Sequence, residues 1–387
     1  MLLQPSAPPN FYGRQWELSL LQGRLIDEHC QVITLLGLGG IGKSALAIRL
    51  MHLTASHFEV VIWRSLRDVP DCNHLLDSLL QLVAPEALGD AHLTLERRQS
   101  FVLDYFRTHR VLLVLDSLDV VLEDGIGSGR MRSEFEGLGR FLRLSAETKH
   151  QSRVVLTSRE KSIELLAHEG NRSPVRVLRL LPLDVNACKE LLAEKDVSGT
   201  DDEQSRLIEI YAGNPLALKI IARTIVDLFN GEISPFLDQG EVIFGGIRTL
   251  LAEQYARLSS LEQSILLWLT ILREPTTMET LLTVIVVPIK RIQLLEAMES
   301  LLQRSLIERG QQQGSFTLQA LVIEYLTNQL ISDISAEIER GVLSRSIEYG
   351  LHLAECADFI RHIQERKFVV PILAALQRAY PQPNTLE

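Results

Sequence analysis

The sequence has little of several features that would each indicate a particular class of protein. Its four cysteines stand far apart, with no C-x-x-C pair and no histidine at ligand spacing, which argues against a metal site or a disulfide framework. We therefore expect reduced thiols in a cytoplasmic protein. No apolar run approaches the length of about 18 residues that a membrane span needs, and residues 281–287 are the nearest candidate. We expect no membrane partner.

An excess of basic residues is also missing. The formal net charge is −10, which argues against a general nucleic-acid-binding surface. The sequence shows no internal repeat and no low-complexity tract. Residues 1–9 contain three prolines and no basic start, so they do not form a secretion signal. We expect residues 1–10 to be a linker.

What the chain does contain is an alternation of short apolar runs with helical stretches. This pattern predicts an α/β fold, with a parallel sheet covered by helices on both faces. At 387 residues the chain exceeds one hydrophobic core, and two or three domains are expected. The stretch between Glu123 and Gly139 is rich in glycine, serine and charge, which predicts a mobile surface loop. The expected strands are 32–36, 60–63, 111–115, 154–156 and 175–180.

After Leu183 the pattern becomes helical, and we expect no strand for over a hundred residues. The glycine-rich segment 231–246 is the best boundary. Beyond it, the turn 309–314 lies between two short apolar runs and predicts a hairpin, so the helices here would form a winged helix. The expected helical stretches are 186–195, 203–211, 216–229, 250–272 and 292–304.

Residues 37–44 (GLGGIGKS) fill every fixed position of the phosphate-binding pattern G-x-x-x-x-G-K-[ST], directly after an apolar run. Glycines let backbone N–H groups approach phosphate oxygens without an intervening Cβ. Lys43 would reach the β- and γ-phosphates, and Ser44 would bind Mg²⁺ at the start of a helix that favours an anion. A plain glycine turn is the alternative. The expected nucleotide contacts are Gly39, Gly40, Ile41, Gly42, Lys43, Ser44 and Ala45.

Two further strand ends carry charged residues that suit such a site. Asp116 follows the run 111–115, where a carboxylate would lie near Mg²⁺ or its waters. Arg159 follows the run 154–156 and, at the same sheet edge, can contact a γ-phosphate. The alternatives are an aspartate that starts a turn and a surface arginine. We expect Lys43, Asp116 and Arg159 to carry catalysis, with Ser44 and Asp116 as the metal ligands.

Four segments follow one another in the order of a known family: 11–14 (FYGR), 58–63 (FEVVIW), 156–159 (LTSR) and 211–218 (YAGNPLAL). In these segments the chain resembles the NB-ARC branch of the signal-transducing STAND nucleotide switches, which includes plant immune receptors and the apoptotic-protease activating factor. The resemblance covers nearly the whole chain and implies ADP or ATP with Mg²⁺. It implies that Phe11, Tyr12, Arg14, Pro215 and Leu216 lie against the nucleotide. Pro215 would also suit the first turn of a helix without any ligand.

Two positions depart from the family pattern. Residues 316–326 resemble the winged-helix motif whose histidine and aspartate latch the diphosphate state, but Gln319 and Ala320 stand in their places. A glutamine amide can still donate a hydrogen bond to a β-phosphate, although it cannot be cationic. Many relatives carry a second acid where this chain has Ser117, so the sequence gives little support for activation of water; Asp119 is a speculative substitute, and we expect slow turnover.

Gln319, the FYGR entrance and the residues Glu-Tyr-Leu at 324–326 look most like bacterial NB-ARC proteins that continue into WD-repeat propellers. No repeat of propeller period occurs here, so we expect sensor and effector domains that flank this chain to be missing from it. The expected parts are a linker (1–10), a P-loop nucleotide-binding domain (11–183), a helical domain with the GxP motif (184–240), a winged-helix domain (247–330) and a C-terminal helical segment (331–387).

The resemblance implies a slow ATPase that acts mainly as a signal-transduction switch. ADP would keep the module closed, and exchange for ATP would expose surfaces for self-assembly into a ring-like oligomer. The alternative is a DNA-binding regulator or AAA-like ATPase that acts through the winged helix. Residues 250–330, however, contain six basic and eight acidic residues, so this segment would neutralise DNA phosphates poorly. A small-molecule kinase is a third interpretation, but no acceptor pocket can be inferred from the sequence.

Overall fold

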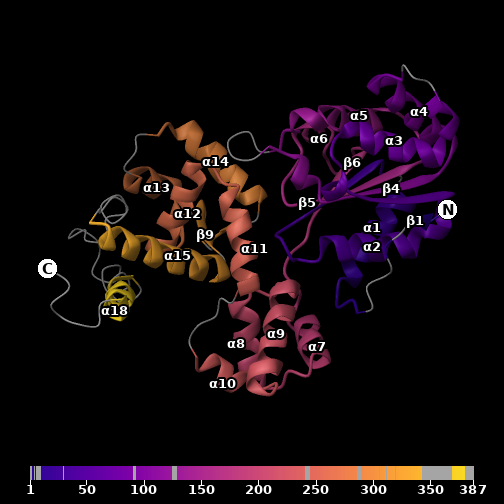
Figure 1. Ribbon diagram of the computed structural model, residues 1–387. Helices are drawn as coiled ribbons and strands as arrows, with labels where there is room; N and C mark the ends of the chain where they lie inside the picture. Colours follow the sequence, from indigo (N-terminus) through magenta and orange to yellow (C-terminus); the bar gives the residue numbers. More distant parts are fainter. Residues whose placement is uncertain are drawn as a thin grey trace. The chain divides into compact units, whose positions relative to one another are not determined.

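The computed structural model of the chain (Figure 1) describes residues 2–3, 5, 10–28, 30–89, 93–123, 129–239, 245–285, 289–304, 306–310, 312–318, 320–341 and 368–379. Internal contacts divide the chain into two compact units, Met1–Ile208 with Gly213–Ile233, and Glu209–Ala212 with Ser234–Glu387. Within the described ranges, no helix combines the length and apolar character that a membrane crossing requires.

A six-stranded sheet lies at the centre of the first unit, in the order β1-β3-β4-β5-β2-β6. All neighbouring strands pair in parallel, so their carboxyl ends lie along one edge. The predicted α/β fold and its five strands are confirmed. The strands are β1 (Leu2–Leu3), β2 (Val32–Leu36), β3 (Val60–Ser65), β4 (Val111–Asp116), β5 (Arg153–Ser158) and β6 (Val175–Arg179).

Alternate strand residues face two separate cores, as the two-residue period of a strand requires. Ile33 and Val114 pack with residues of α1 and α2, whereas Val32 and Leu113 pack with residues of α3, α4 and α5. Figure 1 shows these two sets of helices on opposite faces of the sheet. The helices are α1 (Gln15–Ile26), α2 (Lys43–Thr54), α3 (Cys72–Val83), α4 (Leu95–Thr108), α5 (Glu136–Glu147) and α6 (Ile163–Leu166), with short 3₁₀ turns at Ala55–His57, Leu66–Asp68, Pro85–Gly89, Leu118–Val121 and Ser133–Phe135.

Three helices complete the first unit: α7 (Val185–Glu194), α8 (Asp201–Ile210) and α9 (Pro215–Phe229). Asn214 caps α9, because its side-chain oxygen accepts hydrogen bonds from the N–H groups of Leu216 and Ala217. Pro215 occupies the first turn of α9, where its missing N–H leaves no bond unmade.

The second unit is mainly helical and carries a three-stranded antiparallel sheet of order β7-β9-β8. The predicted hairpin is present as β8 and β9, and the succession of elements is compatible with a winged helix. The predicted helical stretch 250–272 is two helices, because Ser259 starts the second one in a capping box with Glu262. The elements are α10 (Ile233–Leu237), α11 (Gly245–Ala256), α12 (Ser260–Leu272), β7 (Thr276–Thr277), α13 (Met278–Val284), α14 (Arg291–Gln303), β8 (Ile307–Arg309), β9 (Ser315–Leu318), α15 (Ala320–Glu339) and α18 (Val370–Ala379).

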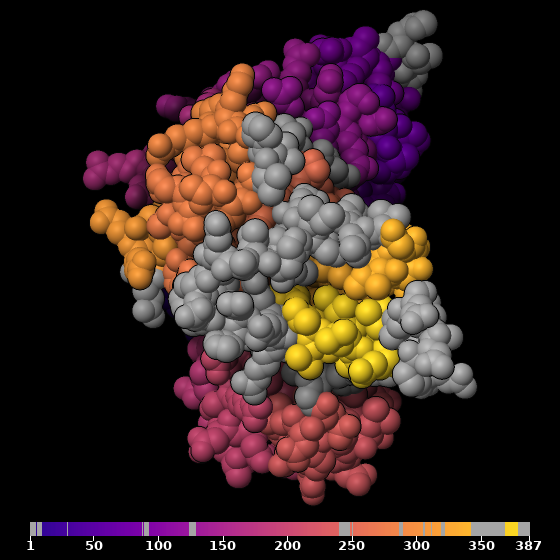
Figure 2. Space-filling view, turned by 90° about the vertical axis from the view of Figure 1, so that its left-hand side faces the viewer, coloured from indigo at the N-terminus to yellow at the C-terminus, as the bar shows by residue number. Residues whose placement is uncertain are grey.

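The end of the described chain packs on this unit. Helix α18, yellow in Figure 2, lies beside α15, drawn in orange. The Arg273 guanidinium stands 5.9 Å from the centre of the Phe368 ring, just before α18.

Three sequence-based expectations are wrong in part. Residues 1–10 are not wholly a linker, since Leu2–Leu3 forms the edge strand β1 and pairs with β3. A strand does recur within a hundred residues of Leu183, because Thr276–Thr277 forms β7. Both strands are two residues long, which is too short to produce an apolar alternation in the sequence.

The expected loop between Glu123 and Gly139 is the third correction. Residues 124–128 lie outside the described residues, but α5 already begins at Glu136. Two of the glycines that suggested a loop serve close packing instead: a Cβ on Gly137 would lie 2.7 Å from Leu95 Cδ2, and one on Gly139 would lie 3.0 Å from Met131 Cγ. Their conformation is helical, and their missing side chains admit neighbouring residues.

Candidate functional site

The glycine-rich loop 37–42 connects β2 to α2 at the carboxyl edge of the sheet. Gly40 and Gly42 have φ angles of 78° and 100°, a left-handed backbone that residues with a Cβ rarely adopt. Gly42 is the N-cap of α2 and makes no side-chain cap bond, so no side chain occupies the place of an anion at this helix start.

Lys43 is held by this loop. Its Nζ donates hydrogen bonds to the carbonyl oxygens of Gly37 at 2.8 Å and Leu38 at 2.9 Å. Only 9% of the residue is exposed, although it carries an ammonium group. A buried cation held by neutral carbonyls is poorly compensated, and an anion nearby would stabilise it.

The surroundings of Lys43 shift its pKa from 10.5 to about 8. Burial is the main cause, because it disfavours the charged form. Asp119 and Asp116 raise the pKa of Lys43, whereas Arg159 and Arg67 lower it. The net effect at this lysine is an unfavourable environment for its charge in the absence of a ligand.

Asp116, at the end of β4, joins three elements through its carboxylate. Its Oδ1 accepts hydrogen bonds of 2.6 Å from Ser44 Oγ on α2 and of 2.6 Å from Thr157 Oγ1 on β5. Its Oδ2 accepts a 3.3 Å bond from Ser117 Oγ. No group of three or more Asp, Glu, His or Cys side chains that could hold a metal occurs among the described residues. One carboxylate with a hydroxyl beside a phosphate site nevertheless fits Mg²⁺, which keeps waters and binds few protein ligands.

Asp119 and Arg159 form an ion pair beside this cluster. The Arg159 backbone N–H donates to Asp119 Oδ1 at 3.1 Å, and Arg159 Nε lies 3.3 Å from Oδ2. Asp119 is only 2% exposed, so the arginine compensates a buried carboxylate. The pair places both charges at the pocket wall.

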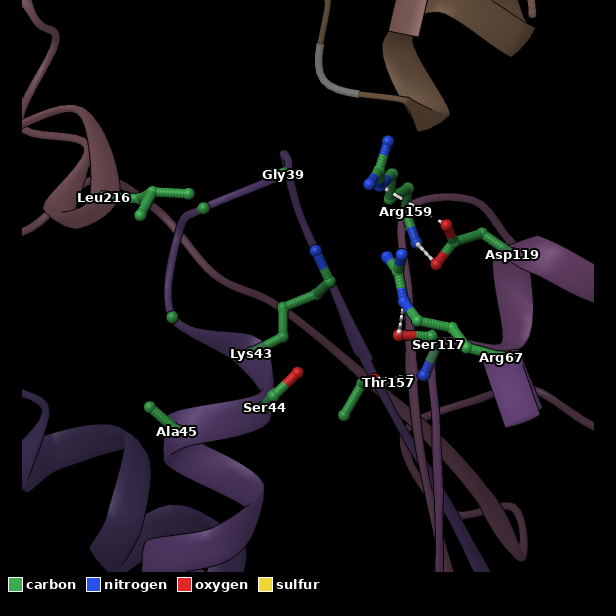
Figure 3. Close-up of a pocket in the computed structure, with 12 residues that line it drawn as sticks. Gly39, Lys43, Ser44, Ala45, Arg67, Ser117, Asp119, Thr157, Arg159 and Leu216 are labelled. Atoms are coloured by element: carbon green, nitrogen blue, oxygen red, sulfur yellow. Dashed lines mark hydrogen bonds and ion pairs between the residues drawn. The ribbon is translucent and has the colours of Figure 1, made fainter. Parts of the chain in front are cut away.

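These residues surround a cavity of about 260 Å³ (Figure 3). Lys43 and Ser44 stand on one side, and Arg67, Asp119 and Arg159 stand on the other. Asp116 is not part of the wall but is bonded to Ser44 and Thr157, which are. The lining residues are Gly39, Gly40, Gly42, Lys43, Ser44, Ala45, Arg67, Ser117, Asp119, Thr157, Arg159 and Leu216.

Arg67 is the lining residue for which the sequence raised no expectation. It follows β3, and its Nε donates a 3.1 Å hydrogen bond to Ser117 Oγ. The sequence pattern that could have identified Arg67 is a basic residue shortly after the expected strand 60–63. The same kind of pattern, after the run 154–156, identified Arg159.

The entrance segment lies beside the glycine loop and does not line the cavity. Arg14 Nη2 donates to the carbonyl oxygens of Ile41 at 3.3 Å and Leu181 at 2.6 Å. Phe11 packs against the core around α1 and α2. The ring of Tyr12 lies 5.9 Å from Lys219 Nζ, and its buried hydroxyl has no hydrogen-bond partner among the described residues. Ile41 is likewise outside the cavity wall.

The start of α9 is hydrogen-bonded directly to the glycine loop. Asn214 Nδ2 donates to Gly39 O at 3.0 Å, and the Leu216 N–H donates to Gly40 O at 3.2 Å. A Cβ on Gly40 would lie 2.7 Å from Leu216 Cβ, so glycine permits this approach. Leu216 lines the cavity and Pro215 does not. Gln319 lies outside the described residues.

A comparison with protein families matches residues 14–194 to the NB-ARC domain. An uncharacterized WD repeat-containing protein of Nostoc is 41% identical over 349 residues, which cover 87% of this chain and 28% of the relative. A disease resistance protein of Arabidopsis thaliana is 25% identical over 207 residues, covering 50% of this chain and 14% of the relative. The chain thus spans less than a third of the length of either relative.

Among solved structures, a Walker-type ATPase of Pyrococcus abyssi superposes with a TM-score of 0.57 at 16% identity, covering 84% of this chain and 98% of that one. At this identity the likeness concerns the fold alone.

Proposed function

Since this chain carries an NB-ARC domain, a P-loop NTPase module, we propose that it is an adenine-nucleotide switch of a signal-transduction protein. The observation that supports this most strongly is the buried Lys43 ammonium, which carbonyl oxygens hold at the start of α2. The next residue, Ser44, donates a hydrogen bond to Asp116, which lies 72 positions further along the chain. Such a site favours polyphosphate, because its cation and helix N-terminus are already desolvated and oriented.

In this proposal Lys43 and the N–H groups of the glycine loop bind the phosphates, and Ser44 and Asp116 hold Mg²⁺. The metal would supply positive charge that neutralises phosphate oxygens. Phe11, Tyr12, Arg14 and Pro215 are proposed for the adenine side, since they lie beside the loop or at the start of α9.

Hydrolysis is proposed to be slow. Residue 117 is a serine, which cannot accept a proton from water at neutral pH, and the nearest candidate base is Asp119. Asp119 is bonded to Arg159, so its carboxylate is occupied until the arginine is drawn toward a phosphate. Arg159 thereby acts as the proposed sensor of the γ-phosphate.

We propose that ADP favours a closed state latched by Gln319, and that ATP favours an open state that self-assembles. The Nostoc relative contains WD repeats, which supports a sensor domain in a longer protein that includes this module.

DNA binding is not favoured. The basic pair in the expected winged helix is Lys290-Arg291, and Arg291 is bonded to Glu279 at 3.1 Å. The neighbouring exposed face of α14 carries Ile292 and Leu295, which cannot neutralise phosphates.

The first experiment is to denature the freshly purified protein and identify released nucleotide by anion-exchange chromatography. We expect near-stoichiometric adenine nucleotide. Lys43→Ala should abolish nucleotide retention, because it removes the cation in the glycine loop. Undiminished ADP binding by this variant, measured by isothermal titration calorimetry, would refute the site.

A further inference from the structure

The wall of the cavity contains a cation that the nucleotide-binding motifs do not account for. Lys43 belongs to the glycine loop and Arg159 to the end of β5, whereas Arg67 comes from the turn after β3. Figure 3 shows the Arg67 side chain on the same side of the cavity as Asp119 and Arg159, facing Lys43 across it.

The three cations differ in how their charge is compensated. Lys43 donates to two carbonyl oxygens, and Arg159 pairs with the buried Asp119. Within the described part of the chain, the Arg67 guanidinium makes one hydrogen bond, to the neutral Ser117 hydroxyl, and no ion pair. Arg67 is exposed to solvent and therefore brings to the cavity wall a cation that no carboxylate of the described residues pairs with.

The residue that Arg67 contacts, Ser117, is neutral and so forms no ion pair with the guanidinium. Its hydroxyl accepts the hydrogen bond from Arg67 Nε and donates one to Asp116 Oδ2. An acidic side chain at this position would face the guanidinium at the distance of an ion pair and neutralise it. With serine there, the guanidinium has donors to spare for an anionic ligand.

We propose that Arg67 is a specificity-determining residue that binds the terminal phosphate of a nucleoside triphosphate and so favours ATP over ADP. The inference rests on the proposed nucleotide site and adds a second cation to Arg159 on the same wall. An arginine fork suits this role, because it offers several N–H donors to one phosphate.

The test measures binding of ADP and of the non-hydrolysable analogue adenylyl imidodiphosphate, each with Mg²⁺, by calorimetry on the full chain. For Arg67→Gln we expect the analogue to bind about tenfold to a hundredfold more weakly, the loss of one charge-assisted hydrogen bond, with ADP affinity unchanged. Arg107→Gln removes an exposed arginine of α4 whose partner is Asp104; neither residue lines the cavity, so both affinities should stay unchanged.

A second variant tests the charge argument without removing the arginine. Ser117→Asp should also weaken the analogue relative to ADP, and the effect should shrink in the Arg67→Gln background. Equal losses for ADP and analogue in Arg67→Gln, or no loss for either, would overturn the assignment of Arg67. If the unmodified chain binds neither ligand, the nucleotide site itself is refuted rather than Arg67 alone.

Discussion

The pKa of Lys43 depends on the charges and the burial of the pocket around it. Its pKa of about 8 is low because its ammonium is buried among carbonyls and near two arginines. A bound phosphate would favour the protonated form and raise this pKa, so binding takes up a proton when the pH exceeds the pKa of the free site.

The first consequence is a pH dependence of nucleotide affinity. Below about pH 7 the free protein already carries the protonated lysine, and the affinity for ADP should change little. As the pH rises through about 8, the Kd should increase, approaching about tenfold per pH unit. Fluorescence titrations with a labelled ADP between pH 7 and pH 9.5 measure this.

Lys43→Arg is the control for that titration, because arginine stays charged over the whole range. Its affinity, although weaker, should be flat between pH 7 and pH 9.5. A flat profile for the unmodified chain would show that Lys43 does not hold the phosphates.

Prediction from sequence succeeded best where chemistry is encoded in adjacent residues. The glycine loop and Asp116 could be found because a strand, a motif and a strand end are local patterns, and the structure brings Ser44 and Asp116 within hydrogen-bond distance. Arg67 was missed because its relevance depends on β3 lying next to β4 in the sheet, which the linear sequence does not state. The residue roles themselves stay predictions.

At the scale of elements, the first turn of α9 does two tasks at once. Asn214 caps the helix through its oxygen and holds Gly39 through its nitrogen. These three hydrogen bonds come from one residue that is 5% exposed.

Asn214→Ala should therefore lower stability and nucleotide affinity together. Loss of the cap predicts a destabilisation of about 1 kcal/mol or more in chemical unfolding. Loss of the bond to Gly39 should loosen the glycine loop and weaken ADP binding severalfold.

Thr94→Ala is the matched control, since Thr94 caps α4 and is not a cavity residue. It should cost similar stability with unchanged ADP affinity. If Asn214→Ala weakened only stability, the bond to Gly39 would have no role in binding.

Elements were harder to predict where packing overrides local preference. Gly137 and Gly139 suggested a loop, yet they lie in α5 because neighbouring side chains fill the space of the missing Cβ atoms. The presence of these glycines in a helix is explained only by the residues packed against them, Leu95 and Met131.

At the scale of the whole molecule, the proposed switch depends on a contact that Gln319 would make with the diphosphate state. Gln319→Leu should weaken the closed state and lower the monomer fraction in the presence of ATP, because leucine cannot donate a hydrogen bond. Light scattering coupled to gel filtration measures the fraction. Gln329→Leu, on α15, is the control and should leave assembly unchanged; an unaltered monomer fraction in Gln319→Leu would count against the latch.

The hydrogen bonds between the start of α9 and the glycine loop also have a consequence for movement of the helix. Helix α9 runs from Pro215 to Phe229, 15 residues, so it is about 22 Å long. A rotation of about 10° at its hydrogen-bonded start would move its far end by about 4 Å over that length. Because the start of α9 is hydrogen-bonded to the carbonyls of Gly39 and Gly40, a small displacement of the loop that rotated the helix would become a larger displacement at its far end.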